Sequence, residues 1–102
     1  MAKVYTSGPI SGKPDLNKPA FEAAATALRA AGHEVVNPHE NGVDPAQPWE
    51  AHMRADIKLL MDCDTVALLD DWADSRGACI EFDLAKRLGM RCVPLVILLA
   101  AP

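Results

Sequence analysis

The chain has 102 residues, a net charge of −4, a hydrophobic fraction of 50% and an aromatic fraction of 5%. This length predicts a single domain over residues 1–102, with a core of Leu, Val, Ile and Ala. The excess of 14 Asp and Glu over 10 Lys and Arg argues against binding a nucleic-acid polymer, which needs clustered basic residues. A free nucleotide is not excluded, because N–H groups at a helix start can hold one phosphate.

Strand and helix signals alternate in the first half of the chain. The β-rich run 3–6 stops at Ser7-Gly8-Pro9, and a second run, 34–36, stops at Asn37-Pro38. Between them, Asn17 is a candidate cap for a helix that ends at Gly32. Residues 38–48 hold three prolines and a glycine, which indicates a loop.

The alternation continues in the second half. Pro48 suits the first turn of a helix whose apolar residues recur at helical spacing: Trp49, Met53, Ile57, Leu60 and Met61. The continuous apolar run 65–69 is typical of a buried parallel strand. A third helix ends at Gly89 and is marked by Ile80, Leu84, Ala85 and Leu88. Residues 92–99 are predicted to be a last strand, which Pro94 places at a sheet edge.

The order β-α-β-α-β-α-β predicts an α/β fold with a parallel sheet of four to five strands and helices on both faces. Ligands of such sheets bind on the loops that follow the carboxyl ends of the strands. The loops of interest are therefore 7–14, 37–48 and 70–78.

The cysteines and histidines predict neither a disulfide framework nor a metal centre. The three cysteines form no CxxC pair, and the start of the chain shows no signal peptide. The apolar tail 93–101 is far shorter than the roughly 20 residues of a membrane helix. We therefore expect reduced thiols in a soluble, cytoplasmic protein. The histidines match no ligand spacing, so His39-Glu40 with Asp44 favours a solvated loop, and we expect no metal or cofactor.

Two carboxylates are candidates for chemistry. Glu81 is expected in the first turn of its helix, where it either completes a pocket or improves the helix start. Asp56 falls beside apolar helix positions, either as a surface partner of a basic residue or as a pocket acid. Two carboxyl groups that converge on a ligand can divide the roles of nucleophile and general acid.

Other features of the loops leave their roles open. The first loop, 7–13, is rich in Gly but lacks both the GxGxxG pattern and the Ser or Thr of a Walker A loop. It is either a turn that approaches a ligand or a plain tight turn. Trp72 either stacks on a planar base or covers the edge of the core.

Taken in order, Tyr5-Thr6-Ser7-Gly8-Pro9-Ile10, Asp56, the run 64–70 and Ser75-Arg76-Gly77-Ala78-Cys79-Ile80-Glu81 resemble the nucleoside 2-deoxyribosyltransferase superfamily. That superfamily includes 2′-deoxynucleoside 5′-monophosphate N-hydrolases and many short phage or prophage proteins. The resemblance covers nearly the whole chain and implies a flavodoxin-like three-layer sandwich. It also implies that Glu81 attacks the anomeric carbon of a deoxyribosyl group, that Asp56 handles the leaving base, and that Tyr5 orients Glu81.

The resemblance implies a small-molecule ligand, a deoxynucleotide or a deoxynucleoside. The residues expected to bind it are Ser7, Gly8, Pro9, Ile10, Ser11, Gly12, Asp70, Trp72, Ser75 and Gly77. The monophosphate hydrolases carry Ser where Ser75 stands, six residues before Glu81, which favours a 5′-phosphate. Ser11, however, takes the place of their first-loop Arg, with Lys13 as a candidate substitute.

The expected function is cleavage of an N-glycosidic bond, by hydrolysis or base transfer, through a covalent glycosyl-Glu81 intermediate. The resemblance also implies a homodimer or higher homo-oligomer, for which helix 49–61 is a candidate interface. In the superfamily a segment after the last strand completes the neighbour's pocket. This chain ends at Pro102, so we expect a more open pocket or a loss of catalysis. The alternative function is that of a catalytically inactive nucleotide-binding or sensor protein that uses the same cleft.

Overall fold

The computed structural model describes residues 2–100. The strands are β1 (Lys3–Ser7), β2 (Glu34–Val36), β3 (Thr65–Leu68) and β4 (Arg91–Pro94). The helices are α1 (Lys18–Ala30), α2 (Trp49–Met61), α3 (Arg76–Arg87) and α4 (Leu95–Ala100). The four strands of this described part form one parallel sheet in the order β2-β1-β3-β4. The predicted α/β fold with alternating strands and helices is therefore confirmed, with four strands.

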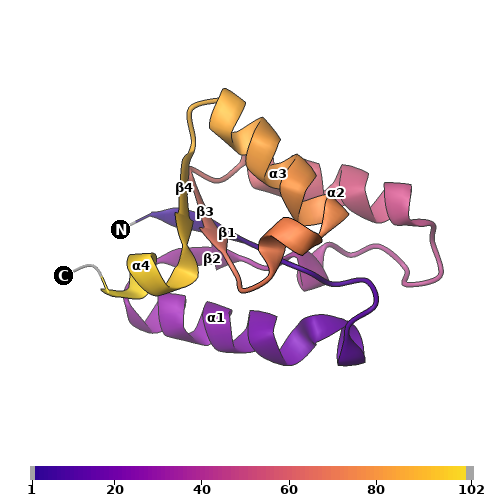
Figure 1. Ribbon diagram of the computed structural model, residues 1–102, viewed down its shortest axis with the longest axis horizontal. Helices are drawn as coiled ribbons and strands as arrows, with labels where there is room; N and C mark the ends of the chain where they lie inside the picture. Colours follow the sequence, from indigo (N-terminus) through magenta and orange to yellow (C-terminus); the bar gives the residue numbers. More distant parts are fainter. Residues whose placement is uncertain (1, 101–102) are drawn as a thin grey trace.

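Helices cover both faces of the sheet, with α2 and α3 on one side and α1 and α4 on the other (Figure 1). Successive residues of a strand point to opposite faces. In β1, Val4 therefore packs with Leu28 of α1, whereas Tyr5 packs with Leu60 of α2 and Ala85 of α3. This alternation decides which side chains of β1 can reach the candidate site.

The start of α1 differs in detail from the prediction. Asn17 does precede the helix, but its backbone is left-handed, with φ of 59°, and its side chain makes no capping bond. Its Nδ2 instead donates to the carbonyl oxygen of Pro9 at 2.8 Å. At the other end, Gly32 follows the helix with φ of 94°, as expected of a residue that ends a helix. Asn17 thus fastens the loop after β1 to the beginning of α1.

The prediction of one strand over residues 92–99 was wrong. Strand β4 ends at Pro94, and the apolar residues after it form helix α4. Proline has no N–H to continue a ladder, and Leu98 gains burial against Val4, Ala25 and Leu28 by turning back onto the α1 face. Pro94 does lie on an edge strand, as expected. Ala101 and Pro102 lie outside the described residues.

Of the apolar residues that mark α3 in the sequence, Ala85 is buried, but two others are not. Ile80 and Leu88 are 41% and 57% exposed, and the buried residues of the helix are Ala78, Glu81 and Ala85. Because α3 begins at Arg76, Glu81 lies in its second turn. Its carboxylate is therefore too far from the helix N-terminus to stabilise it through the helix dipole. The interpretation of Glu81 as a residue that improves the helix start therefore fails.

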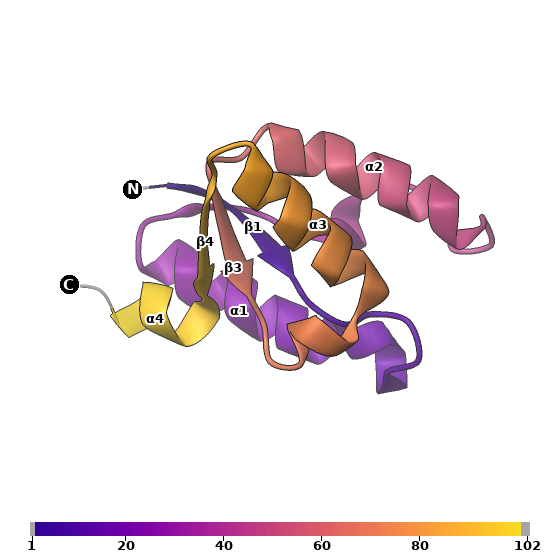
Figure 2. The same ribbon diagram turned by 45° about the horizontal axis from the view of Figure 1, so that its top comes forward.

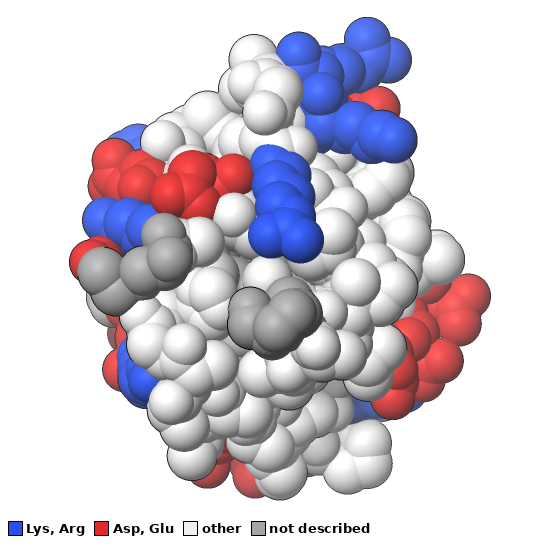
Figure 3. Space-filling model, turned by 90° about the vertical axis from the view of Figure 1, so that its left-hand side faces the viewer, with Lys and Arg blue, Asp and Glu red and all other residues white. Residues whose placement is uncertain are grey.

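Uncharged residues cover much of the surface at the end of the molecule where both chain termini lie (Figure 3). Val96 and Ile97 of α4 are large apolar side chains that are 67% and 55% exposed. Cys63, Cys79 and Cys92 are free thiols. No helix formed by residues 2–100 has the length and apolar character needed to cross a bilayer.

Candidate active site

Two alternate residues of β1 hold the carboxylate of Glu81. Tyr5 Oη donates a hydrogen bond of 2.5 Å to Glu81 Oε2, and Ser7 Oγ donates one of 2.7 Å to Oε1. Tyr5 and Ser7 point the same way because they are two residues apart on a strand. Glu81 is only 4% exposed, so both of its oxygens are removed from bulk water and satisfied by hydroxyl groups.

Burial raises the pKa of Glu81 to about 7. The hydrogen bonds from Tyr5 and Ser7 lower it, and the negative charge of Asp56 adds a smaller upward effect. Burial, followed by the charges of Glu81 and Asp56, raises the pKa of Tyr5 well above its ordinary value. Tyr5 is therefore a permanent hydrogen-bond donor, and Glu81 can hold or release a proton near neutral pH.

The second carboxyl group, Asp56, lies on α2 and is also buried, with 6% exposure. Burial raises its pKa, against the lowering effects of a hydrogen bond from Asn41 and of His52. The bond runs from Asn41 Nδ2 to Asp56 Oδ1 and measures 2.9 Å. A buried carboxyl group with a raised pKa is suited to donate a proton.

Glu81 and Asp56 line the same cleft, which has a volume of about 680 Å³. Its walls come from the loop after β1, the loop after β2, the N-terminal half of α2 and the start of α3. Figure 2 shows the end of β1 and the N-terminal ends of α2 and α3 at one end of the molecule. The cleft therefore lies where a parallel sheet is expected to bind its ligand.

Most of the residues predicted to bind the ligand line this cleft. They are Gly8, Pro9, Ile10, Ser11, Gly12, Ser75 and Gly77. Gly8 is required by space, because a Cβ there would lie 2.8 Å from Leu69 Cβ. Ser75 caps α3 by accepting a 3.2 Å hydrogen bond from the Ala78 N–H. Ser7, predicted to touch the ligand, instead contacts Glu81.

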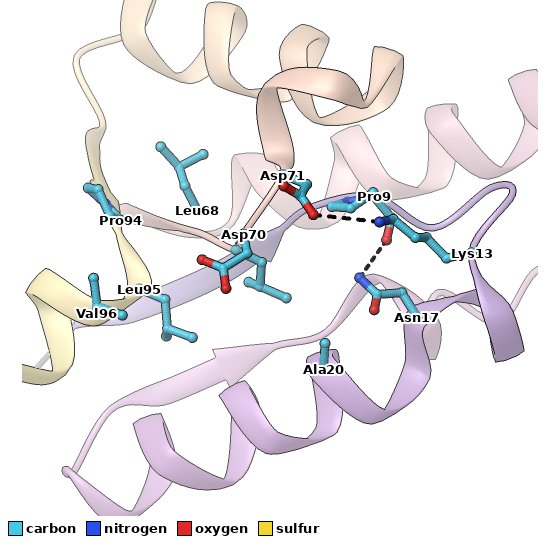
Figure 4. Close-up of a pocket in the computed structure, with 11 residues that line it drawn as sticks. Pro9, Lys13, Asn17, Ala20, Leu68, Asp70, Asp71, Pro94, Leu95 and Val96 are labelled. Atoms are coloured by element: carbon cyan, nitrogen blue, oxygen red, sulfur yellow. Dashed lines mark hydrogen bonds and ion pairs between the residues drawn. The ribbon is translucent and has the colours of Figure 1, made fainter.

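Asp70 and Trp72 lie away from this group. Asp70 lines a separate pocket of about 330 Å³ between α1 and the ends of β3 and β4 (Figure 4). Lys13 and Asp71 line both this pocket and the cleft, and their side chains form an ion pair of 3.6 Å where the two cavities meet. The Trp72 ring packs on Phe82, with 4.6 Å between ring centroids, which favours the interpretation that it covers the core edge.

Several residues of the cleft were not predicted to be part of the site. Among them are Asn41, Trp49, His52, Met53 and Arg76. Trp49, His52 and Met53 precede Asp56 by seven, four and three positions, so helical spacing was a usable signal for them. The guanidinium of Arg76 lies 4.2 Å from the centroid of the Trp49 ring. Asn41 comes from an irregular loop, where no periodicity reveals which way a side chain points.

One protein-family model matches nearly all of the residues that form this fold. A model described as "Domain of unknown function (DUF4406)" matches residues 2–94. The chain belongs to this family. No curated protein sequence matches this DUF4406 member.

Among solved structures, this DUF4406 domain is similar to a 2-deoxyribosyltransferase from the psychrotolerant bacterium Bacillus psychrosaccharolyticus. The TM-score is 0.69 at 23% sequence identity, and the match covers 89% of this chain and 69% of the other. At this identity the similarity shows a shared fold. Within residues 2–100, the part of the chain that the structure describes, no three or more His, Cys, Asp or Glu side chains are grouped to hold a metal ion.

Proposed function

We propose that the protein cleaves the N-glycosidic bond of a 2′-deoxynucleotide or 2′-deoxynucleoside. The observation that carries this proposal is the buried Glu81 carboxylate, held by Tyr5 and Ser7 in the cleft that Asp56 also lines. Loss of a base from a deoxyribosyl group develops positive charge at the anomeric carbon, which an adjacent carboxylate stabilises or captures. The base leaves readily only when a proton is supplied to it.

The proposed reaction has two steps. In the first step, an Oε atom of Glu81 bonds to C1′ while the C1′–N bond breaks. The electron pair of the C1′–N bond passes to the base, and the base takes the proton of Asp56. Water then bonds to C1′, its proton returns to Asp56, and the bond between Glu81 and C1′ breaks to restore the carboxylate. Attack by a second base in place of water gives transfer. The active form of the pair therefore carries one proton, with Glu81 ionised and Asp56 protonated.

Within this proposal the substrate is a 5′-monophosphate. Lys13 is paired with Asp71 at 3.6 Å. Arg76 is instead held against the Trp49 ring, next to Ser75 at the start of α3. A hydroxyl at position 75 tolerates a phosphate where a carboxylate would repel it. Arg76 is thus the cation that we assign to the phosphate, in place of the first-loop Arg that Ser11 replaces.

Chromatography tests the proposal most directly. The protein is incubated with the four common deoxynucleoside 5′-monophosphates and their nucleosides, with and without an acceptor base, and free base is measured. We expect base release from a monophosphate and none from the Glu81→Gln variant. Mass spectrometry of the acid-quenched protein should show a deoxyribosyl 5-phosphate adduct on Glu81. No release from the whole panel would sink the proposal, and binding without release would instead support a nucleotide-binding protein.

The predicted homo-oligomer is part of the same proposal. Met61, near the end of α2, is 42% exposed and is the apolar residue by which we expect that helix to contact a second copy. Sedimentation velocity of the protein and of the Met61→Lys variant measures this directly. A monomer at all concentrations would contradict it.

A further inference from the structure

Asn41 connects the loop after β2 to Asp56 through both halves of its side-chain amide. Its Oδ1 accepts a hydrogen bond of 2.9 Å from the Val43 N–H, which closes a turn within the loop. Its Nδ2 donates the bond of 2.9 Å to Asp56 Oδ1. The amide is thus oriented by the backbone on one side and by a buried carboxyl group on the other.

This orientation has no equivalent alternative. If the amide were flipped, its oxygen would face the Asp56 carboxyl group and its NH₂ would face the Val43 N–H, so both hydrogen bonds would be lost. This orientation of Asn41 also gives the two carboxyl oxygens of Asp56 different roles. Because Oδ1 already accepts an N–H, a proton on Asp56 must reside on Oδ2.

The other groups around Asp56 are few. His52, one turn earlier on α2, has its Nδ1 at 3.4 Å from Asn41 Nδ2. Glu81 of α3 and Tyr5 of β1 interact electrostatically with Asp56 across the cleft. Among the described residues, the hydrogen bond to Asp56 comes from Asn41 alone. Control of the direction in which Asp56 presents its proton therefore falls to Asn41.

We infer that Asn41 is a positioning residue, which fixes Asp56 so that Oδ2 is the oxygen that exchanges a proton with the leaving base. This inference rests on the proposed function and assigns a role that the sequence did not indicate. Since misplacing a catalytic group by about 1 Å can cost on the order of 100-fold in rate, we expect kcat to fall at least tenfold when Asn41 is replaced.

The sharpest probe is Asn41→Asp. This variant keeps the acceptor for the Val43 N–H but sets an oxygen in place of the donor to Asp56, which adds a like charge and raises the pKa of Asp56. Asp44→Asn is the matched control, because Asp44 Oδ1 accepts from the Ala46 N–H in a similar turn of the same loop. Asn41→Ala, which removes both bonds, serves if Asn41→Asp does not fold.

Two measurements are made on each variant. The first follows the ¹³C signal of the Asp56 carboxyl carbon by NMR as the pH is varied. We expect its midpoint at higher pH in Asn41→Asp and Asn41→Ala, and unchanged in Asp44→Asn. The second is the pH profile of kcat/KM. The upper limb of this profile is set by Glu81, so the lower limb should move to higher pH with the Asp56 midpoint and by a similar amount.

The two measurements separate the two ideas. An Asp56 titration that does not respond to either Asn41 variant would overturn the role of Asn41, whatever the activity. A kcat/KM profile that keeps its lower limb and its maximum in Asn41→Asp would overturn it equally. Absence of base release by the unaltered protein would instead overturn the proposed function, and the NMR titration would remain readable.

Discussion

The side chains of Tyr5 and Glu81 are separated by 76 positions in the chain and joined by a hydrogen bond of 2.5 Å. The parallel sheet makes this possible, because β1 lies in its interior and α3 packs on the face toward which Tyr5 points. The bond links the first strand to the third helix through Glu81, which lines the cleft. The position and the protonation of Glu81 therefore depend on how α3 packs against the sheet.

Glu81 should make the fold more stable in acid than at neutral pH. Its pKa is raised from 4.5 to about 7, so the native state binds the proton more tightly than the unfolded chain. The resulting stability is complete below pH 4.5 and is lost as the pH rises through about 7, with a size of about 3 kcal/mol. Urea denaturation from pH 4.5 to 8 should show this slope, and Glu81→Gln should flatten it. Equal slopes in the two proteins would contradict the assignment.

The rate of base release should be bell-shaped in pH, because the Glu81–Asp56 pair is active with one proton, which exchanges between the two carboxyl groups. Its upper limb should lie near pH 7, the pKa of Glu81, where the pair loses that last proton. Tyr5→Phe removes a hydrogen bond that lowers the pKa of Glu81, so this limb should move to higher pH. Loss of a hydrogen bond to a charged group should also cost about 2 kcal/mol of transition-state stabilisation. The measurement is kcat/KM from pH 4 to 9, and an unmoved upper limb would argue against Glu81 as its source.

Asp56→Asn should affect substrates according to how much their base needs a proton. With ordinary bases the rate should fall by roughly 10²–10⁴, the usual contribution of a general acid. A purine methylated at N7 already carries positive charge and leaves without a proton, so its release should fall far less. Parallel rates on the two substrates measure this. A uniform loss would indicate that Asp56 only binds or only supports the fold.

Arg76→Gln should lower kcat/KM for the deoxynucleoside monophosphate about tenfold, as loss of one charge-assisted contact predicts, and leave the unphosphorylated nucleoside unaffected. Arg87→Gln is the matched control, because Arg87 lies at the opposite end of α3 and pairs with Asp83 at 3.1 Å. The measurement is the ratio of kcat/KM for the monophosphate to kcat/KM for the nucleoside, taken for each variant. If both substrates lose equally, Arg76 does not read the phosphate.

Gly8→Ala should destabilise the protein by about 1–3 kcal/mol, because the new Cβ would lie 2.8 Å from Leu69 Cβ and the backbone must move. Gly42→Ala separates this effect from conformational strain, since Gly42 has φ of 76° and nothing within 4 Å of the added carbon. That control should cost about 1 kcal/mol, and Gly8→Ala should cost more than the control. Thermal unfolding followed by circular dichroism gives both values, and equal losses would show that the approach to Leu69 relaxes freely.

Periodicity was sufficient to predict the sheet and insufficient to predict helix α4 after its last strand. The runs 3–6, 34–36 and 65–69 are rich in apolar or β-branched residues and bounded by turn residues, so their character as strands could be predicted. In the run 92–99 the same apolar composition serves a short strand and then a helix, because burial of Leu98 on α1 decides the outcome. Such a tertiary contact leaves no local signal.

The candidate site was predictable only in part for a similar reason. Glu81, Asp56 and Tyr5 were selected together through resemblance, since spacing alone left both carboxylates undecided. Helical geometry places Trp49 and Met53 beside Asp56, but a pattern of apolar residues does not distinguish a cleft from a core. Asn41 acts from a loop whose turn is closed by its own side chain, so its direction depends on the folded backbone.

The division of the sheet into two faces has a consequence for how the protein tolerates change. The groups proposed to react come from the α2 and α3 side, whereas Val4, Ala25, Leu28 and Leu98 fill the opposite layer. A library of conservative apolar replacements in that second layer should alter melting temperature while turnover per folded molecule stays constant. The α1 and α4 side is therefore the place to engineer thermal stability.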